Sequence, residues 1–411
     1  MPADASLVVR HYKPADSAAC LQLEISGSEL RSAGGLLEMA FWHHNDFDAK
    51  SRQFRSHVLL VCEDTAASAI CGVIAIAIKR LCVHGKEVLC GYVFDLRIDY
   101  AYRRRGIGGS LAREAEARAA AMGVQYLYLT VNGTNDKAQR LYRSLGWVPA
   151  SHRKMHVSPL FLAPAAASAD RAAAAKGGGV RQLGTEEALD LVSRYYAKRD
   201  LGLSRAEFEH LFASPSYLTT FFATDAPAGT DGASSAAIVL WHGSRLTGIK
   251  PIRMVLHAST WAKLAPLAPA AFFAMLAGAL GLLWTGAASS LFSQLACVAM
   301  ALVVIATFVL YLWANSRTAL RARAIAPVAE GPAWEPLMRA VYAAARKEAR
   351  QRGFGILLAN LDADSPVVHC LCGKTRTGNI GSPPAFWHKM LGGGAPLERL
   401  APDSFFDPRD I

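Results

Sequence analysis

The chain has 411 residues, with 44 Lys and Arg against 33 Asp and Glu, which gives a formal net charge of +11 at pH 7. This length allows two or three domains. The positive charge would suit a nucleic-acid surface, but no basic stripe with interleaved exposed aromatic residues is present, so nucleic acid is not an expected partner.

The eight cysteines are scattered along the chain, and several fall in predicted strands, where Cys behaves as a small hydrophobic residue. Cys370-x-Cys372 is too short for a zinc knuckle and no paired Cys-x-x-Cys pattern occurs. We therefore expect reduced thiols facing the cytosol and no metal. The start, Met1 to Asp4, lacks a basic region followed by an apolar run, so no secretory signal is expected.

Strands and helices alternate through the first part of the chain. The pattern starts with a strand, a helix that begins after a proline, and two more strands, of which the second is strongly β-branched. A further long strand then leads into a turn rich in Arg and Gly. We expect these elements at residues 7–11, 14–25, 58–63, 70–80 and 88–99.

The turn after this last strand has the pattern Arg103-x-x-Gly106-x-Gly108 and opens directly onto a helix. Glycine lets backbone N–H groups approach an anion, and the N-terminal end of a helix is partially positive. Arginine adds fork-shaped donors for phosphate oxygens. The sequence therefore predicts that a pyrophosphate binds here. The helix is expected to end at Gly123.

A second pattern follows this helix. Residues 126–131 are typical of a strand, and Asn135 is a good N-cap for the next helix. Gly146 is a good residue to end that helix. Its expected apolar face consists of Ala138, Leu141, Tyr142 and Leu145.

Together, the Arg/Gly turn and the Asn135 helix resemble motifs A and B of the GNAT family of acetyl-CoA-dependent N-acetyltransferases in type, order and spacing. The resemblance implies an α/β fold of the α+β type, with a twisted mixed sheet whose central strands splay apart. Coenzyme A would enter the splay, with its pyrophosphate on the turn and its pantetheine on main-chain groups of the strand. The implied cofactor-binding residues are Leu96, Arg97, Ile98, Arg103, Arg104, Arg105, Gly106, Ile107, Gly108, Gly109, Ser110 and Asn135.

The chemistry of the family is direct attack of a neutral amine on the thioester. It needs a base to deprotonate the ammonium and an acid for the leaving thiolate. By the motif match Tyr142 is the candidate acid, although a Tyr on an apolar helix face is commonly a packed residue. Asp95 is the candidate base, acting through water, and a structural hydrogen-bonding role for Asp95 is an equal alternative.

A linker and a second half follow. Residues 162–178 are Ala, Ser and Gly-rich without an apolar period, so we interpret them as a linker. The elements of residues 179–411 then repeat the earlier order, and we expect a degenerate GNAT-like domain. At the corresponding turn only Glu330-Gly331-Pro332 is present, without arginines, so this half is not expected to bind coenzyme A. Its expected strands are 179–183, 217–223, 236–241, 252–257 and 355–360, and its expected helices are 185–197, 334–352 and 386–390.

The whole arrangement resembles the plant HOOKLESS-type N-acetyltransferases. The resemblance rests on the N-terminal unit, on Glu-Gly-Pro before a helix, on a Trp-His/Lys segment near the end, and on the closing Phe406-Asp407-Pro408-Arg409-Asp410. It covers most of the chain, but its C-terminal motifs are short.

One segment departs from that pattern. No charged residue occurs between Lys263 and Arg317, and the apolar runs 264–285 and 291–314 each exceed the ~20 residues that cross a bilayer. Basic residues flank the pair on both sides, which by the positive-inside rule places both domains on the cytosolic side. The sequence predicts a transmembrane helical hairpin within 264–314 and a membrane-associated protein. The alternative is a buried helical pair in a soluble cytoplasmic or nuclear protein.

We therefore expect a catalytic domain at 1–161 that uses acetyl-CoA to acetylate an amine of a protein or small-molecule acceptor. The alternative is a catalytically inactive, GNAT-derived protein that binds coenzyme A as a regulator or scaffold at a membrane. The intact Arg/Gly turn and Tyr142 favour the enzyme.

Overall fold

The structure is a computed structural model of the chain. It describes residues 6–29, 37–40, 46–133, 135–160, 179–225, 230, 232–243, 252–256, 278, 298–299, 302, 318–319, 321–362, 365–367, 384–391, 405 and 407. Two compact units are present. The large unit contains residues 1–27, 42–250 and 320–411, and the small unit contains residues 28–41 and 251–319.

The first half of the large unit is a sheet with helices on both faces. Strands β1, β3, β4 and β5 pair antiparallel in this order, and β6 pairs parallel with β5. The strands are β1 (Leu7–His11), β3 (Ser56–Asp64), β4 (Ala69–Val83), β5 (Lys86–Ile98), β6 (Tyr126–Asn132) and β7 (Val148–Pro159). The helices are α1 (Ser17–Glu29), α2 (Ile107–Ala121) and α3 (Asp136–Ser144), with short 3-10 turns η1 (Pro14–Asp16), η2 (Phe47–Ala49), η3 (Ser51–Gln53) and η4 (Tyr100–Tyr102).

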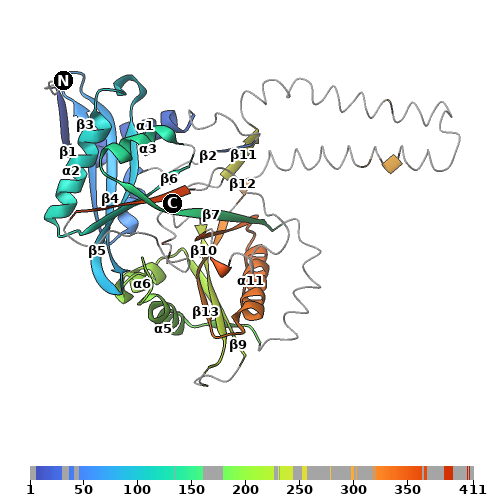
Figure 1. The fold of residues 1–411 in the computed structure, drawn as a ribbon. Helices are drawn as coiled ribbons and strands as arrows, with labels where there is room; N and C mark the ends of the chain where they lie inside the picture. Colours follow the sequence, from blue (N-terminus) through green and yellow to red (C-terminus); the bar gives the residue numbers. More distant parts are fainter. Residues whose placement is uncertain are drawn as a thin grey trace. The chain divides into compact units, whose positions relative to one another are not determined.

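The second half of the large unit repeats this order (Figure 1). Its strands are β8 (Arg181–Leu183), β9 (Tyr217–Thr224), β10 (Ser235–His242), β13 (Arg321–Glu330), β14 (Ile356–Asp362) and β15 (Pro384–Met390). Its helices are α5 (Thr185–Tyr196), α6 (Arg205–Phe212) and α11 (Trp334–Gln351). As in the first half, an antiparallel meander ends in a strand, here β13, which pairs parallel with the strand after the next helix.

The two halves share one twelve-stranded sheet, in the order β1-β3-β4-β5-β6-β15-β7-β14-β13-β10-β9-β8. Strand β15 of the second half lies between β6 and β7 of the first and is antiparallel to both. In turn, β7 pairs with β14. Residues 201–204 also bond to the end of β4, through Cys82 N–H to Gly202 O at 2.7 Å and Leu201 N–H to Cys82 O at 2.8 Å. Each half therefore completes the other.

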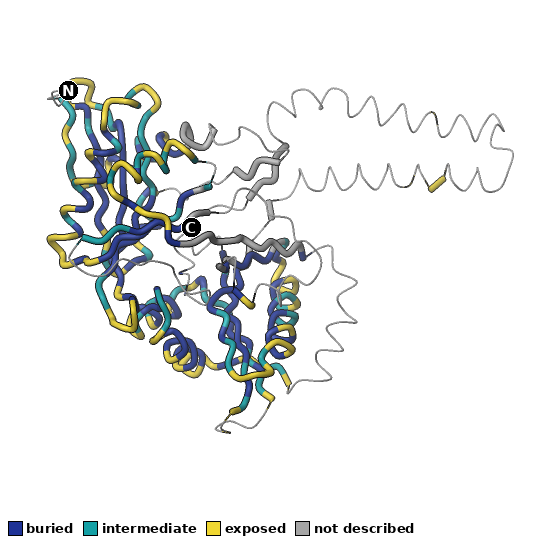
Figure 2. The backbone as a smooth tube through the Cα atoms, viewed as in Figure 1, coloured by how far each residue is buried: buried dark blue, intermediate teal, exposed yellow. Residues whose placement is uncertain are grey.

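The core has a different arrangement on each face of the sheet. On one face, α1, α5 and α6 cover a single apolar cluster that draws residues from both halves, including Tyr92, Tyr128, Phe208 and Trp241. On the other face, α2 and α3 cover a first-half cluster and α11 covers a second-half cluster. Figure 2 shows the buried positions concentrated along the strands and the inner sides of the helices.

The two halves repeat each other down to one irregularity. In the first half, β5 carries a bulge opposite β4, and Asp95 there has a positive φ of 51°. In the second half, β13 carries a bulge opposite β10, and Ala326 has a φ of 47°. Both residues come two positions after the last parallel pair, which is Val93 with Leu129 in one half and Ala324 with Ala359 in the other.

One predicted element of the second half is wrong, and another is a strand as predicted but lies in a different sheet. Residues 386–390 were expected to be a short helix and instead form strand β15, where Phe386, Trp387 and His388 are all buried. A strand that is covered on both faces lacks the regular alternation of apolar and polar residues. Its sequence pattern therefore does not distinguish it from a buried helix. The strand expected at 252–257 is β11 (Ile252–Leu256), but it belongs to another sheet, and β13 takes its place beside β10.

The small unit contains a three-stranded sheet, in the order β12-β11-β2, formed by β12 (Thr318–Ala319), β11 and β2 (Leu37–Ala40). The predicted hairpin 264–314 lies outside the described residues except at isolated positions. Among the residues that are described, no helix has the length and apolar character to span a bilayer, so the structure gives the hairpin no support.

Candidate functional site

The two central strands of the first half part from each other. Strands β5 and β6 pair from Cys90 with Tyr126 to Val93 with Leu129 and no further. Both strands continue, β5 to Ile98 and β6 to Asn132. Beyond Val93, β6 therefore no longer pairs with the edge of β5 that faced it. This is the splay of the central strands that the GNAT resemblance implied. We call the region where residues 94–98 and 130–132 no longer pair with each other the slot.

The Arg/Gly turn stands where β5 leads into α2. Gly106 has a φ of 82°, a conformation that other residues adopt only at a cost, and it precedes the first helical residue. The helix begins with the bond from Ser110 N–H to Gly106 O at 3.0 Å. By helix geometry the N–H groups of Ile107, Gly108 and Gly109 have no partner within the helix. Nothing lies within 4 Å of where a Cβ on Gly106 would be, so the turn is open.

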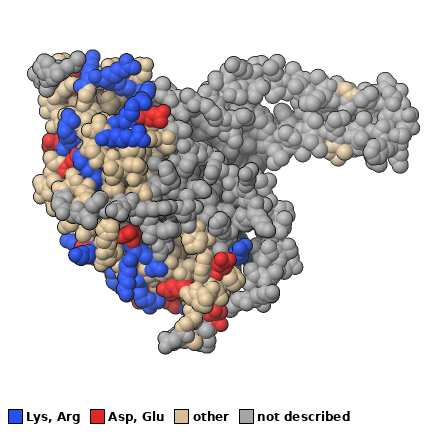
Figure 3. Space-filling model, in the orientation of Figure 1, with Lys and Arg blue, Asp and Glu red and all other residues tan. Residues whose placement is uncertain are grey.

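Arginines surround this helix end. Arg104 and Arg105 are exposed, Arg103 is half-buried, and the guanidinium groups of Arg103 and Arg105 lie over the rings of Tyr100 and Tyr102. Arg113, which the sequence analysis missed, folds back one turn, so that its Nη1 would be 3.3 Å from a Cβ on Gly109. In the view of Figure 3, the largest gathering of Lys and Arg lies over the first half. Partial and full positive charges thus coincide at the turn.

Two of the predicted cofactor residues have structural roles. A Cβ on Gly108 would lie 3.3 Å from Leu141 Cδ2, so this glycine allows close packing of α3 against α2. Asn135 caps α3, because its side-chain oxygen accepts from Ala138 N–H at 3.2 Å. Its predicted contact with the cofactor stays a prediction.

The bulge at the start of the slot carries charged side chains. Asp95 and Glu24 of α1 are each about nine-tenths buried, at 9% side-chain exposure. Between them lies Arg97, whose Nη2 is 3.4 Å from Asp95 Oδ1 and 3.7 Å from Glu24 Oε1. Leu96 and Ile98 pack toward the α2 face. The structure therefore places the candidate base beside a guanidinium, which favours its charged form.

The candidate acid Tyr142 lies on the α2 face. It is buried, packs with Trp147 at a ring distance of 5.5 Å, and belongs to the cluster that Leu96 and Ile98 border. Burial raises the pKa of Tyr142 above its ordinary value, with Arg97 opposing the shift. The hydroxyl is therefore protonated at neutral pH, as an acid must be before it acts.

On the opposite face a row of rings crosses the sheet where the strands part. Neighbouring ring centroids are 5.3 to 5.8 Å apart. The row consists of Phe54, Phe94, Tyr92, Tyr128 and Phe386. We call it the aromatic row. The sequence analysis missed it because its members come from β5, β6, β15 and the loop before β3.

The corresponding turn of the second half is closed. Gly331 has a φ of 78°, but a Cβ there would lie 2.7 Å from Ser234 Cα. The Ser234 hydroxyl accepts from Ala333 N–H, at the start of α11, at 2.9 Å. Beyond the last pair of β13 with β14, Tyr196 donates to Pro327 O of β13 at 2.7 Å. In the second half, the start of the helix and the carbonyl of Pro327 are thus bonded to other groups of the protein itself, whereas the Arg/Gly turn of the first half is open.

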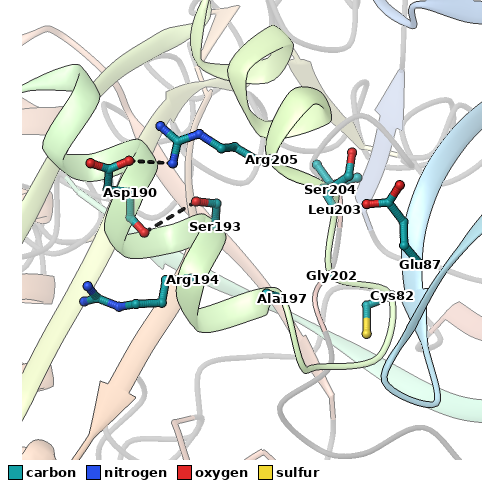
Figure 4. Close-up of a pocket in the computed structure, with 10 residues that line it drawn as sticks. All are labelled: Cys82, Glu87, Asp190, Ser193, Arg194, Ala197, Gly202, Leu203, Ser204 and Arg205. Atoms are coloured by element: carbon teal, nitrogen blue, oxygen red, sulfur yellow. Dashed lines mark hydrogen bonds and ion pairs between the residues drawn. The ribbon is translucent and has the colours of Figure 1, made fainter.

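A separate cleft of about 490 Å³ lies between the β4–β5 hairpin and helices α5 and α6 (Figure 4). The ion pair of Asp190 with Arg205 is on one side, and Glu87 and Cys82 are on the other. None of the predicted site residues lines this cleft, so it is distinct from the slot. Within the described part of the chain, no cluster of His, Cys, Asp and Glu could hold a metal ion.

Comparisons with known proteins agree with this geometry. Residues 28–147 match the sequence model of the Acetyltransferase (GNAT) family. The match covers less than a third of the chain, so it makes this segment similar to that family. The match spans the slot, the turn, Tyr142 and Asp95. No curated protein matches the chain, and the resemblance to the HOOKLESS-type enzymes is not confirmed.

The similar solved structures are distant in sequence. A Saccharomyces cerevisiae N-myristoyltransferase with bound myristoyl-CoA and inhibitors is 11% identical, with a TM-score of 0.55 over 99% of this chain and 88% of that one. Another structure of that enzyme, with bound myristoyl-CoA, is 12% identical, with a TM-score of 0.53 over 94% and 83%. A Kribbella flavida GCN5-related N-acetyltransferase is 12% identical, with a TM-score of 0.47 over 95% and 72%. At 11% and 12% identity, the similarity to the two N-myristoyltransferase structures shows a shared fold and nothing more.

Proposed function

We propose that the protein is an acetyl-CoA-dependent N-acetyltransferase that acts on an amine of a protein or small molecule. The observation that supports this most directly is the open Arg/Gly turn at the positive end of α2, next to the slot. A diphosphate fits the turn because free N–H groups and guanidinium groups converge there. The closed turn at Gly331 indicates one acetyl-CoA per chain.

In this proposal the coenzyme lies with its pyrophosphate on the turn and its pantetheine along the unpaired edge of residues 96–98. Peptide groups on that edge have the spacing of a strand and would bond the amides of the pantetheine. Because α2 and the turn lie on one face, the thioester would reach toward the other face. We call that opposite face, which carries Tyr92 and Phe94, the acceptor face.

The transfer itself is a single displacement. The amine nitrogen forms a bond to the thioester carbonyl carbon, the C–S bond breaks, and the sulfur takes a proton from the Tyr142 hydroxyl. The nitrogen then loses its extra proton, which returns through water to the Tyr142 oxygen, so that the amide, free coenzyme A and the phenol result. The ammonium first loses a proton to a base, for which Asp95 is the candidate. Asp95 would accept this proton through water, with Arg97 Nη2 at 3.4 Å from its Oδ1.

The experiment is release of free thiol from acetyl-CoA over a panel of amines, with an amine-free control and a series of longer acyl-CoA thioesters. We expect amine-dependent thiol release that is fastest with acetyl-CoA. A preference for a long acyl chain would support an acyltransferase whose donor is a longer acyl-CoA and not acetyl-CoA. Binding of acetyl-CoA without release would favour the alternative, a regulator or scaffold. No binding at millimolar concentration would refute both.

Membrane association is a separate proposal, based on the uncharged segment 264–314. We expect the full-length protein to stay with membranes after a carbonate wash, because a hairpin of two apolar helices is held by the hydrocarbon core. A variant that lacks residues 264–314 is the control and should be released. Release of the intact protein by carbonate would rule out the hairpin.

A further inference from the structure

Phe405 and Asp407, near the C-terminus, contact residues of both halves on the acceptor face. The ring of Phe405 lies 4.9 Å from Tyr196 and 5.0 Å from Phe208, on the second-half helices α5 and α6. Its main-chain N–H donates to Asp200 O at 3.0 Å. Two residues later, Asp407 reaches a first-half strand, where its Oδ2 is 3.0 Å from Lys79 Nζ.

This ion pair is deeply buried. The side chains of Lys79 and Asp407 are 0% and 2% exposed. Removing two charges from water is costly, and the attraction compensates only when the geometry is good. A buried pair is weak evidence for stability and better evidence that two particular segments must meet. Here it joins residue 407 to a strand more than 300 positions earlier.

Lys79 also contacts the aromatic row. Its Nζ lies 5.3 Å from the ring centroids of Phe54, Tyr92 and Tyr128 alike. Tyr92 and Tyr128 face each other on β5 and β6, one position before the last pair of the two strands. The Tyr92 hydroxyl lies 3.4 Å from the Thr130 hydroxyl, which is on the β6 side of the slot. A chain of contacts thus runs from Asp407 through Lys79 to the mouth of the slot.

We propose that Phe405 and Asp407 form a strap in which Asp407, acting through Lys79, holds Tyr92 and Tyr128 in place at the slot, so that both charged residues are positioning residues for the acceptor. This inference rests on the proposed function. The strap fixes the positions of the Tyr92 and Tyr128 rings on the acceptor face. It does not act on the turn that is proposed to bind the coenzyme. Its loss should therefore change the kinetics for the amine and not those for acetyl-CoA.

The test compares three variants with the wild-type protein. Lys79→Met with Asp407→Asn removes both charges together and keeps the approximate volumes. Phe405→Leu loosens the strap from the second half without touching the ion pair. Phe212→Leu is the matched control, because Phe212 is a buried ring of the same apolar cluster that packs with Tyr217 and Trp241 and is separated from Phe405 by the ring of Phe208.

We expect the double variant and Phe405→Leu to lower kcat/KM for the amine by about tenfold or more, as small misplacements in an active site do, with KM for acetyl-CoA unchanged. In the protein without ligand, hydrogen exchange should speed up in peptides covering 92–98 and 128–132 and stay the same in α2. Phe212→Leu should leave both measurements as in the wild type. If exchange at the slot is unchanged in variants that remain folded, the strap is overturned.

The two proposals fail differently. Exchange is measured on the free protein, so it judges the strap even if acetyl-CoA does not bind. If the wild-type protein shows no binding and no thiol release, the proposed function fails. If the double variant folds and turns over the amine like the wild type, Asp407 and Lys79 are structural only and the positioning role is wrong.

Discussion

At the residue scale, two glycines with the same backbone conformation differ in what surrounds them. Gly106 and Gly123 have φ of 82° and 84°, they flank α2, and an added Cβ would meet nothing within 4 Å at either position. The strain of a side chain is therefore the same at both, about 1–2 kcal/mol for a left-handed residue. Only Gly106 borders the proposed diphosphate site.

This pair gives a controlled prediction. Gly106→Ala and Gly123→Ala should lower the free energy of unfolding by similar amounts in urea denaturation. Gly106→Ala should in addition weaken acetyl-CoA by about tenfold, equivalent to ~1.4 kcal/mol, because its methyl group stands where phosphate oxygens approach. Calorimetric titration measures the difference. Equal affinities in the two variants would contradict a diphosphate at the turn.

Tyr142 is the second residue whose role can be separated from its packing. Tyr142→Phe keeps the ring against Trp147 and should leave acetyl-CoA affinity unchanged. It should lower kcat by about a hundredfold, the lower range for loss of a general acid. Because burial raises the pKa of Tyr142, the phenol stays protonated as pH rises. The decrease in kcat caused by deprotonation of Tyr142 should therefore occur above pH ~10, the ordinary pKa of Tyr. An unchanged kcat in the variant would remove the role.

At the scale of elements, the turns before α2 and α11 differ in whether the helix end is open, so an anion site is proposed for only one half. Both have a left-handed glycine before a helix. In the second half the connection is short, and Ser234 fills the space and bonds the helix end. The longer connection of the first half, through η4 and the arginines, leaves that end open. Loop length and one serine decide the difference.

The closed turn predicts an asymmetric response to substitution. Gly331→Ala should destabilise the protein by about 3 kcal/mol, because strain is joined by a clash with the backbone of Ser234. Gly353→Ala, at φ 80° with open space around it, is the control in the same half and should cost only the strain, about 1–2 kcal/mol. Chemical denaturation compares them. Equal losses would mean that the turn has room to relax.

At the scale of the whole molecule, the shared sheet makes the halves interdependent. Strand β15 separates β6 from β7, and Lys389 on it pairs with Glu116 of α2 at 2.7 Å. Without β15, the polar edges of β6 and β7 and the rings beside Phe386 would be exposed to water.

We therefore expect a fragment of residues 1–161 to fail to fold alone, and the chain containing both halves to unfold in one cooperative transition of the large unit. Circular dichroism and calorimetry of the fragment and the full chain test this. A folded, acetyl-CoA-binding fragment would show that β15 is dispensable.

Local patterns were sufficient to predict much of the first half. The period of its strands, the Asn135 cap and the Arg103–Gly108 turn depend on residues close in sequence, so the helix start and the buried face with Tyr142 were predictable. The splay of the strands was expected only from the family resemblance. The 28–147 match supports the family inferred from those residues. The proposed roles of Asp95 and Tyr142 stay predictions.

Contacts between distant segments could be decided only by the tertiary structure. The exchange of β7 and β15 between halves, the aromatic row and the Lys79–Asp407 pair depend on residues hundreds of positions apart. A buried strand such as β15 shows no alternation, because both of its faces are covered, and its sequence alone suits a helix equally well. The sequence alone indicated that residues of the Arg103–Gly108 turn are suited to bind an anion. Only the tertiary structure decided which of the two similar turns stays open, because Ser234, almost a hundred positions before Gly331, fills the second one.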